Sequence, residues 1–172
     1  MATPDEALSA IAALRSDRES GKFFQYFPDC ASGCRTTSSH PEDHEGMCRV
    51  LYRKHMAFFA SRDRERLMIA ANRIGKPQAG AFETTAHLTG EYPEWWEGRK
   101  FEEPVSWWAV GDTSKTVRDI GQLELMGPMN AIGTGFIPRH RIEHFSRKPG
   151  VTDAIETVGE ACGAGAWCAV SE

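Results

Sequence analysis

Two short apolar runs, each followed by a helical pattern, most constrain the fold of this chain. Residues 66–70 (RLMIA) and 105–111 (VSWWAVG) have the character of buried strands. Residues 77–89 and a segment that ends at Gly127 place apolar side chains at helical spacing. Strand-then-helix units in sequence are typical of a parallel sheet covered by helices. We therefore predict an α/β fold, a partial sheet of about three parallel strands flanked by helices.

The rest of the chain divides into segments of different character. Residues 4–19 and 49–61 carry amphipathic helical patterns, and residues 21–46 are rich in Gly, Ser, Thr, Pro and Cys with no period. Such a segment is expected to be a loop unless a ligand organises it. We predict an N-terminal helix and Cys/His-rich loop (1–48), an α/β domain (49–158) and a Gly/Ala/Cys tail without a clear period (159–172).

Composition excludes several classes of protein. The 172 residues include 41% hydrophobic ones, which suffice for one core, and 20 Lys+Arg against 24 Asp+Glu give a net charge of −4. This balance argues against a basic nucleic-acid surface spread over the whole chain. The apolar runs are far shorter than a membrane helix, and the N-terminus lacks a basic n-region. We expect a soluble, intracellular protein.

Five potential zinc ligands lie between residues 30 and 48. They are Cys30, Cys34, His40, His44 and Cys48. A structural zinc ion takes four thiolate or imidazole ligands and can order a segment that has no core of its own. The candidate ligands are the three cysteines and one of the two histidines, for which we take His44. The alternative is free thiols and solvated histidines, since an odd number of cysteines without a secretory signal makes a disulfide framework unlikely.

Residues 70–77 (AANRIGKP) partly match the phosphate-binding loop G-x-x-x-x-G-K-[ST]. Gly75 and Lys76 match, whereas Ala70 and Pro77 do not. In such loops the backbone N–H groups at a helix N-terminus surround the phosphates and the lysine neutralises them. The alternative is an ordinary turn at Gly75 and a solvated Lys76. The candidate nucleotide-binding residues are Ala71, Asn72, Arg73, Ile74, Gly75 and Lys76.

Several separate strings, taken together, resemble a known family. They are 51–59 (LYRKHMAFF), 65–76 (ERLMIAANRIGK), 87–99 (HLTGEYPEWWEGR), 108–113 (WAVGDT), 125–128 (LMGP), 133–138 (GTGFIP) and 147–151 (RKPGV). In this order they resemble the ATPase segment of the large subunit of tailed-bacteriophage terminases, which package DNA into the procapsid. The resemblance covers about residues 49–158.

The resemblance implies a nucleotide-binding domain of the phosphate-loop type. Gly75 and Lys76 would hold the phosphates of ATP, and Arg73 would lie near them. The family normally has Thr or Ser where Pro77 stands, which puts magnesium binding in doubt, and its acidic strand motif and nuclease domain do not appear. The resemblance thus implies ATP binding without turnover by this chain alone. The implied partners are double-stranded DNA, the portal protein and the terminase small subunit, in the cytoplasm of a bacterial host.

Beyond residue 158 the sequence no longer resembles the family. A truncated or frame-shifted reading frame would explain both this change and the short length. The competing interpretation is a non-enzymatic prophage remnant or a zinc-organised binding module. Strands missing from the family fold would leave an apolar sheet edge uncovered, and such edges promote association. We therefore also predict self-association of the isolated chain.

Overall fold

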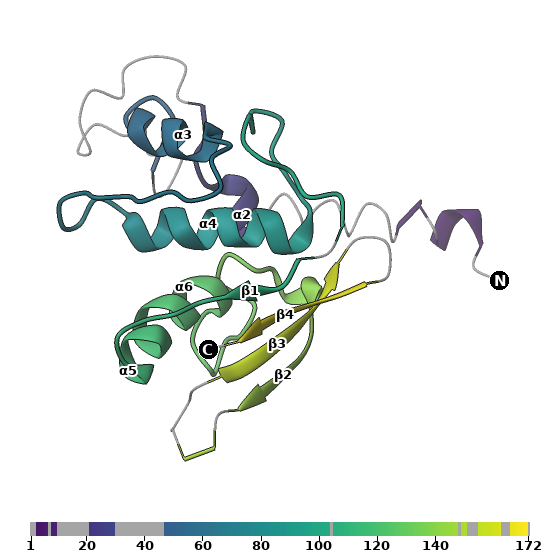
Figure 1. Cartoon of the computed structure of the whole chain (residues 1–172). Helices are drawn as coiled ribbons and strands as arrows, with labels where there is room; N and C mark the ends of the chain where they lie inside the picture. The colour runs from purple at the N-terminus through teal and green to yellow at the C-terminus, as the bar shows by residue number, and fades with distance from the viewer. Residues whose placement is uncertain are drawn as a thin grey trace.

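A computed structural model describes residues 3–6, 8–9, 21–29, 47–103, 105–147, 149–150, 155–162 and 166–171 (Figure 1). Its elements are α2 (Lys22–Gln25), α3 (Arg53–Ala60), α4 (Lys76–Thr89), β1 (Trp107–Trp108), α5 (Ser114–Thr116), the π-helix η1 (Val117–Gln122), α6 (Leu123–Met126), the 3-10 helix η2 (Arg139–Arg141), β2 (Ile142–Arg147), β3 (Ile155–Cys162) and β4 (Ala166–Ser171). In these ranges no helix is long and apolar enough to cross a membrane.

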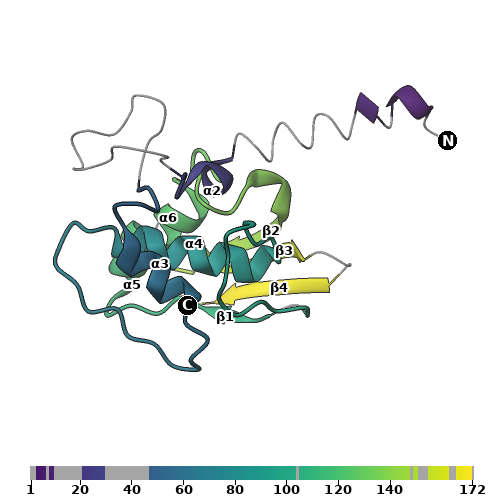
Figure 2. The same ribbon diagram turned by 90° about the horizontal axis from the view of Figure 1, so that it is seen from above.

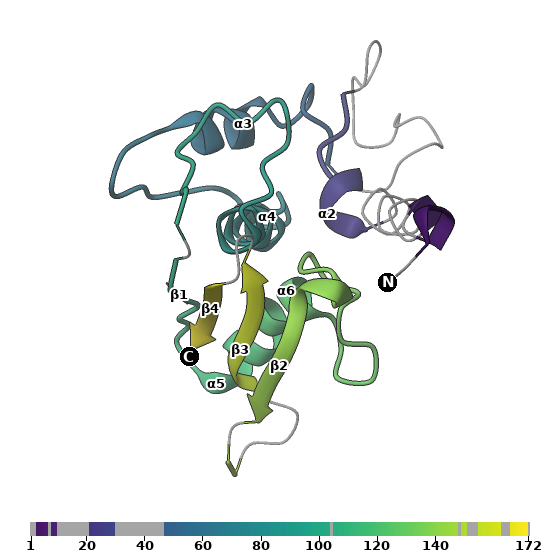
Figure 3. The same ribbon diagram turned by 90° about the vertical axis from the view of Figure 1, so that its right-hand side faces the viewer.

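Helix α4 is the central element of the molecule. It lies between α3 on one face and the sheet with α6 on the other (Figures 1 and 3). In the view from above, α3 accordingly overlaps α4 (Figure 2). It contacts α6, η1 and β3, and every residue from 81 to 89 is buried. A helix that is covered all round is a core helix. The helix predicted at 77–89 is confirmed.

Glycines in left-handed conformation set both ends of α4. Gly75 precedes the helix with φ 79°, and Gly90 follows it with φ 68°. Pro77 lies in the first turn, where its missing N–H has no intrahelical partner to lose. The chain therefore turns sharply into and out of this helix.

The sheet has the order β1-β4-β3-β2. Pairs β2–β3 and β3–β4 are antiparallel, and only β1 and β4 run parallel. The described residues thus form a mixed sheet, which differs from the predicted run of parallel strands. The difference arises because the C-terminal segment, predicted as a tail without a clear period, supplies β4 and part of β3.

Residues 66–70 were predicted as a strand, but they pair with no other strand in the described ranges. They nevertheless alternate in burial as a strand does: Leu67 and Ile69 are 80% and 86% exposed, whereas Met68 packs against the core. Residues 105–110 alternate in the same way, with Trp108 and Val110 exposed. Strands of parallel sheets are usually buried on both faces. Each segment has one covered face and one open apolar face.

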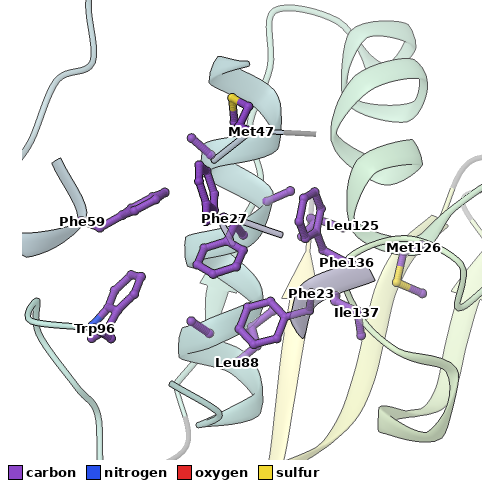
Figure 4. Close-up of a cluster of buried hydrophobic side chains, with 14 of the residues drawn as sticks. Phe23, Phe27, Met47, Phe59, Leu88, Trp96, Leu125, Met126, Phe136 and Ile137 are labelled. Atoms are coloured by element: carbon purple, nitrogen blue, oxygen red, sulfur yellow. The ribbon is translucent and has the colours of Figure 1, made fainter. Parts of the chain in front are cut away.

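Aromatic rings make up much of the core beside α4, among them Phe23, Phe27 and Phe59 (Figure 4). Phe82 of α4 lies among these rings. The Phe82 ring stacks on Phe23 at 4.7 Å and on Trp95 at 5.7 Å between centroids, and Phe27 meets it edge-on at 4.9 Å. Phe23 comes from α2, a short helix within a segment predicted as loop. The buried Phe23 ring packs α2 against α4. The polar composition of residues 21–46 did not predict this contact.

The helix predicted to end at Gly127 is confirmed. The Thr113 hydroxyl accepts a 3.1 Å hydrogen bond from the Thr116 N–H at its start, and Gly127 ends it with φ 83°. Its middle, η1, is a π-helix, which the sequence did not indicate. At the N-terminus, residues 4–6 and 8–9 are helical, and Thr3 and Glu6 cap this turn reciprocally. The remainder of the predicted helix at 4–19 lies outside the described residues.

Candidate phosphate-binding site

The loop between residues 70 and 76 contains two residues in left-handed conformation. Arg73 has φ 62° and Gly75 has φ 79°. The left-handed conformation costs a non-glycine residue about 1–2 kcal/mol, so the surroundings must hold Arg73 there. Loops in which left-handed residues alternate with others can turn neighbouring N–H groups to one side, and such concavities bind anions.

The left-handed φ at residue 75 favours glycine there. The end of the Met47 side chain lies close to this glycine, since a Cβ there would be 2.7 Å from the Met47 Cε and still closer to the sulfur. The buried Met47 side chain therefore packs directly on the backbone of the loop. The sequence predicted the glycine but gave no sign of the methionine that covers it.

Lys76 begins α4 and folds back over the loop. Its Nζ donates hydrogen bonds of 2.7 Å to the carbonyl oxygens of Ala70 and Ala71. The first N–H groups of α4 have no intrahelical acceptor, and the helix dipole makes this end partly positive. A bound phosphate would therefore compete with two carbonyl oxygens for the ammonium group.

An open hollow of about 490 Å³ lies over this loop. Four of the six predicted residues line it: Asn72, Arg73, Gly75 and Lys76. The other two act through their backbones, since Ala71 accepts from Lys76 and Ile74 contacts His55. Pro77 of the sequence motif lines the hollow as well. The sequence did not identify the remaining lining residues, which are Tyr26, Met47, Tyr52 and Gln78.

Glu124 of α6 connects the hollow to two other helices. Its carboxylate accepts a 2.7 Å hydrogen bond from the Gln78 amide and pairs with the Lys22 ammonium at 2.9 Å. Burial, followed by the nearby charge of Glu124, raises the pKa of Tyr26 to about 12. The Lys22 partner offsets the negative charge of Glu124 at the edge of the hollow.

His55 of α3 lies behind the loop. Its side chain is buried, and its Nε2 has no hydrogen-bond partner. Burial lowers the pKa of the imidazole, and a backbone hydrogen bond to Ile74 opposes that shift. His55 therefore holds the loop from inside as a neutral ring at neutral pH.

Most of the predicted zinc site lies outside the described residues, namely Cys30, Cys34, His40 and His44. Cys48 is fully buried against Val50 and Leu51. In the part of the chain that the structure describes, no group of three or more His, Cys, Asp or Glu side chains could hold a metal ion. Zinc binding stays a prediction.

Comparison with known proteins shows similarity to a phage protein. The large subunit of the terminase of Salmonella phage P22 is 35% identical over 100 residues. This chain is similar to part of a phage terminase large subunit. The match covers 49% of this chain and 20% of the relative, so the chain spans about a fifth of that protein's length. No protein-family model and no solved structure matches the chain.

Proposed function

We propose that this chain is the nucleotide-binding part of a DNA-packaging protein of the terminase large-subunit kind, and that residues 71–76 hold the phosphates of ATP. One observation supports this above all: a strained loop with left-handed Arg73 and Gly75 leads into the N-terminus of a core helix, which begins with Lys76. Similarity to the terminase of phage P22 gives this loop its functional context.

The parts of the proposed site have separate roles. Backbone N–H groups at the start of α4 receive the phosphate oxygens, while Lys76 exchanges its two carbonyl acceptors for them. Arg73 lines the same hollow and adds a second positive charge. We infer that the loop and α4 belong to an α/β fold of the phosphate-loop type. In that fold, residues 66–70 would be a strand paired with further strands.

Pro77 determines the expected role of magnesium. Phosphate-binding loops use a Ser or Thr hydroxyl at this position as a magnesium ligand, and proline has neither this hydroxyl nor an N–H group. The chain is therefore proposed to bind ATP without depending on magnesium and not to hydrolyse it alone. In the complete packaging machine, the partners would be double-stranded DNA, the portal protein and the small subunit in the host cytoplasm.

Calorimetry with a non-hydrolysable ATP analogue, with and without magnesium, tests the proposal. We expect binding to the wild type that magnesium does not change and at least a tenfold loss in Lys76→Ala, because one charged contact contributes about 1.5–3 kcal/mol. Lys54→Ala removes an exposed lysine of α3 and serves as the matched control. Pro77→Thr is expected to make the affinity depend on magnesium.

Two outcomes would contradict the proposal. The first is no binding to the wild type. The second is equal loss in Lys76→Ala and Lys54→Ala. Stoichiometric zinc on the purified protein, combined with no nucleotide binding, would instead favour the zinc-organised module.

A further inference from the structure

Arg66 lies at the start of the segment that leads to the loop, and three contacts hold its guanidinium. One nitrogen donates to the Phe58 carbonyl oxygen at 2.9 Å, and another pairs with the Glu83 carboxylate at 2.5 Å. The group also lies 4.7 Å from the centre of the Phe58 ring. A planar guanidinium can bind two acceptors in fixed directions, which an ammonium cannot.

Glu83 ties this contact to α4, the helix that begins at the loop. Its side chain is only 7% exposed, and the same oxygen lies 3.5 Å from the His87 Nε2. A buried carboxylate needs such partners because desolvation of its charge is costly. The ion pair between Arg66 and Glu83 therefore joins the two ends of a chain segment that contains the candidate residues 71–76.

Between these anchors the segment has side-chain contacts but no strand partner in the described ranges: Met68 packs against the core, and His55 binds the backbone of Ile74. Leu67 and Ile69 point to solvent. At its far end, Lys76 binds the carbonyl oxygens of Ala70 and Ala71. A phosphate in the hollow would draw this ammonium away, whereas the Arg66–Glu83 pair would stay in place.

We propose that Arg66 and Glu83 are positioning residues, which keep residues 67–75 in the phosphate-binding conformation when Lys76 leaves the loop carbonyls. This inference rests on the proposed nucleotide binding for its functional consequence. The ordering of the loop by the ion pair can be tested without any ligand.

The test compares Glu83→Gln and Arg66→Lys with Glu91→Gln. Glu91 pairs with Arg141 away from the loop, and its side chain is 14% exposed, so Glu91→Gln breaks a similar ion pair elsewhere. The first measurement is the backbone ¹⁵N order parameter of residues 67–75 without ligand. The second is the Kd of a non-hydrolysable ATP analogue.

We expect order parameters near 0.85 for residues 67–75 in the wild type and in Glu91→Gln, and below about 0.6 in Glu83→Gln and Arg66→Lys. We also expect Kd to rise about tenfold in the latter two variants, as for a loop that is competent one-tenth of the time. Arg66→Lys keeps the charge, so it still decides the matter if Glu83→Gln does not fold.

Unchanged order parameters in both loop variants, or an equal fall in Glu91→Gln, would overturn the inference. If the wild type binds the analogue, an unchanged Kd in both Glu83→Gln and Arg66→Lys would also overturn it. If the wild type binds no analogue, the proposed function fails, and the order parameters alone decide whether the ion pair positions the loop.

Discussion

Gly98 faces the carbonyl oxygen of Phe59 so closely that no side chain fits between them. A Cβ on residue 98 would also lie 3.1 Å from the Phe59 carbonyl carbon, which is backbone and cannot turn aside. The neighbouring Trp96 indole donates a 3.0 Å hydrogen bond to the Arg99 carbonyl oxygen and fixes the turn. The connection after α4 is thus seated directly on the end of α3.

Replacing Gly98 by alanine should therefore destabilise the fold. We expect Gly98→Ala to lower the free energy of unfolding by about 1–3 kcal/mol, as overpacking does. The matched control is Gly80→Ala in α4, where nothing lies within 4 Å of the added methyl. Alanine there should stabilise the helix by about 0.5–1 kcal/mol. Urea denaturation of both variants measures the difference, and equal effects would contradict the close approach.

Phe82 should be the most costly core residue to truncate. Its ring is fully buried and contacts Phe23, Phe27 and Trp95. Phe82→Ala is expected to cost about 3–5 kcal/mol, which approaches the whole stability of a small domain. Leu67→Ala, at an exposed site, should change stability by less than about 0.5 kcal/mol. Similar costs for the two variants in chemical denaturation would show that α4 is not the centre of the core.

Tyr26 should make the fold sensitive to high pH. Its pKa is raised from 10 to about 12 in the folded chain, so the unfolded state loses the phenol proton first. The stabilisation is complete below pH 10 and is lost between pH 10 and 12. It amounts to at most about 2.7 kcal/mol, and partial exposure of the ring lowers it.

Thermal unfolding as a function of pH measures this effect. Tyr26→Phe should reduce the loss between pH 10 and 12. A part should persist, because burial also raises the pKa of Tyr92. An identical alkaline decline in wild type and Tyr26→Phe would contradict the assignment.

His55 should make the fold sensitive to low pH. Burial lowers its pKa below 6.5, so the unfolded chain binds a proton more readily than the folded one. Stability is therefore full above pH 6.5 and falls as the pH drops below this value. The same denaturation series on His55→Gln should have a weaker acid dependence, whereas the exposed His140→Gln should behave like the wild type. A wild-type acid slope in His55→Gln would contradict this role.

Local patterns in the sequence predicted α4, the helix that ends at Gly127 and the glycine of the candidate loop. The spacing in residues 77–89 and the glycine at 75 are local signals, and α4 begins and ends where these signals place it. Residues 66–70 show the limit of this reasoning. Their short apolar run predicts a buried strand, but a strand also requires a partner, which local sequence does not specify.

Long-range contacts could not be predicted in the same way. Tyr26, Met47 and Tyr52 line the hollow because their segments, distant in sequence, pack beside the start of α4, and no local spacing in those segments indicates this. The pairing of β3 with β4 could not be predicted for the same reason. Residues 159–172 carry no clear period, so these strands form through contacts with each other and not from a local pattern.

We have proposed that nucleotide phosphates bind at the start of α4. Titration of a ¹⁵N-labelled chain with a non-hydrolysable ATP analogue, followed through the backbone amide shifts, locates the bound phosphates. We expect the largest shifts at residues 72–76 and 78, and their loss in Lys76→Ala. Shifts confined to other hollows, such as the one lined by residues 96–100, or no shifts at all, would contradict the proposal.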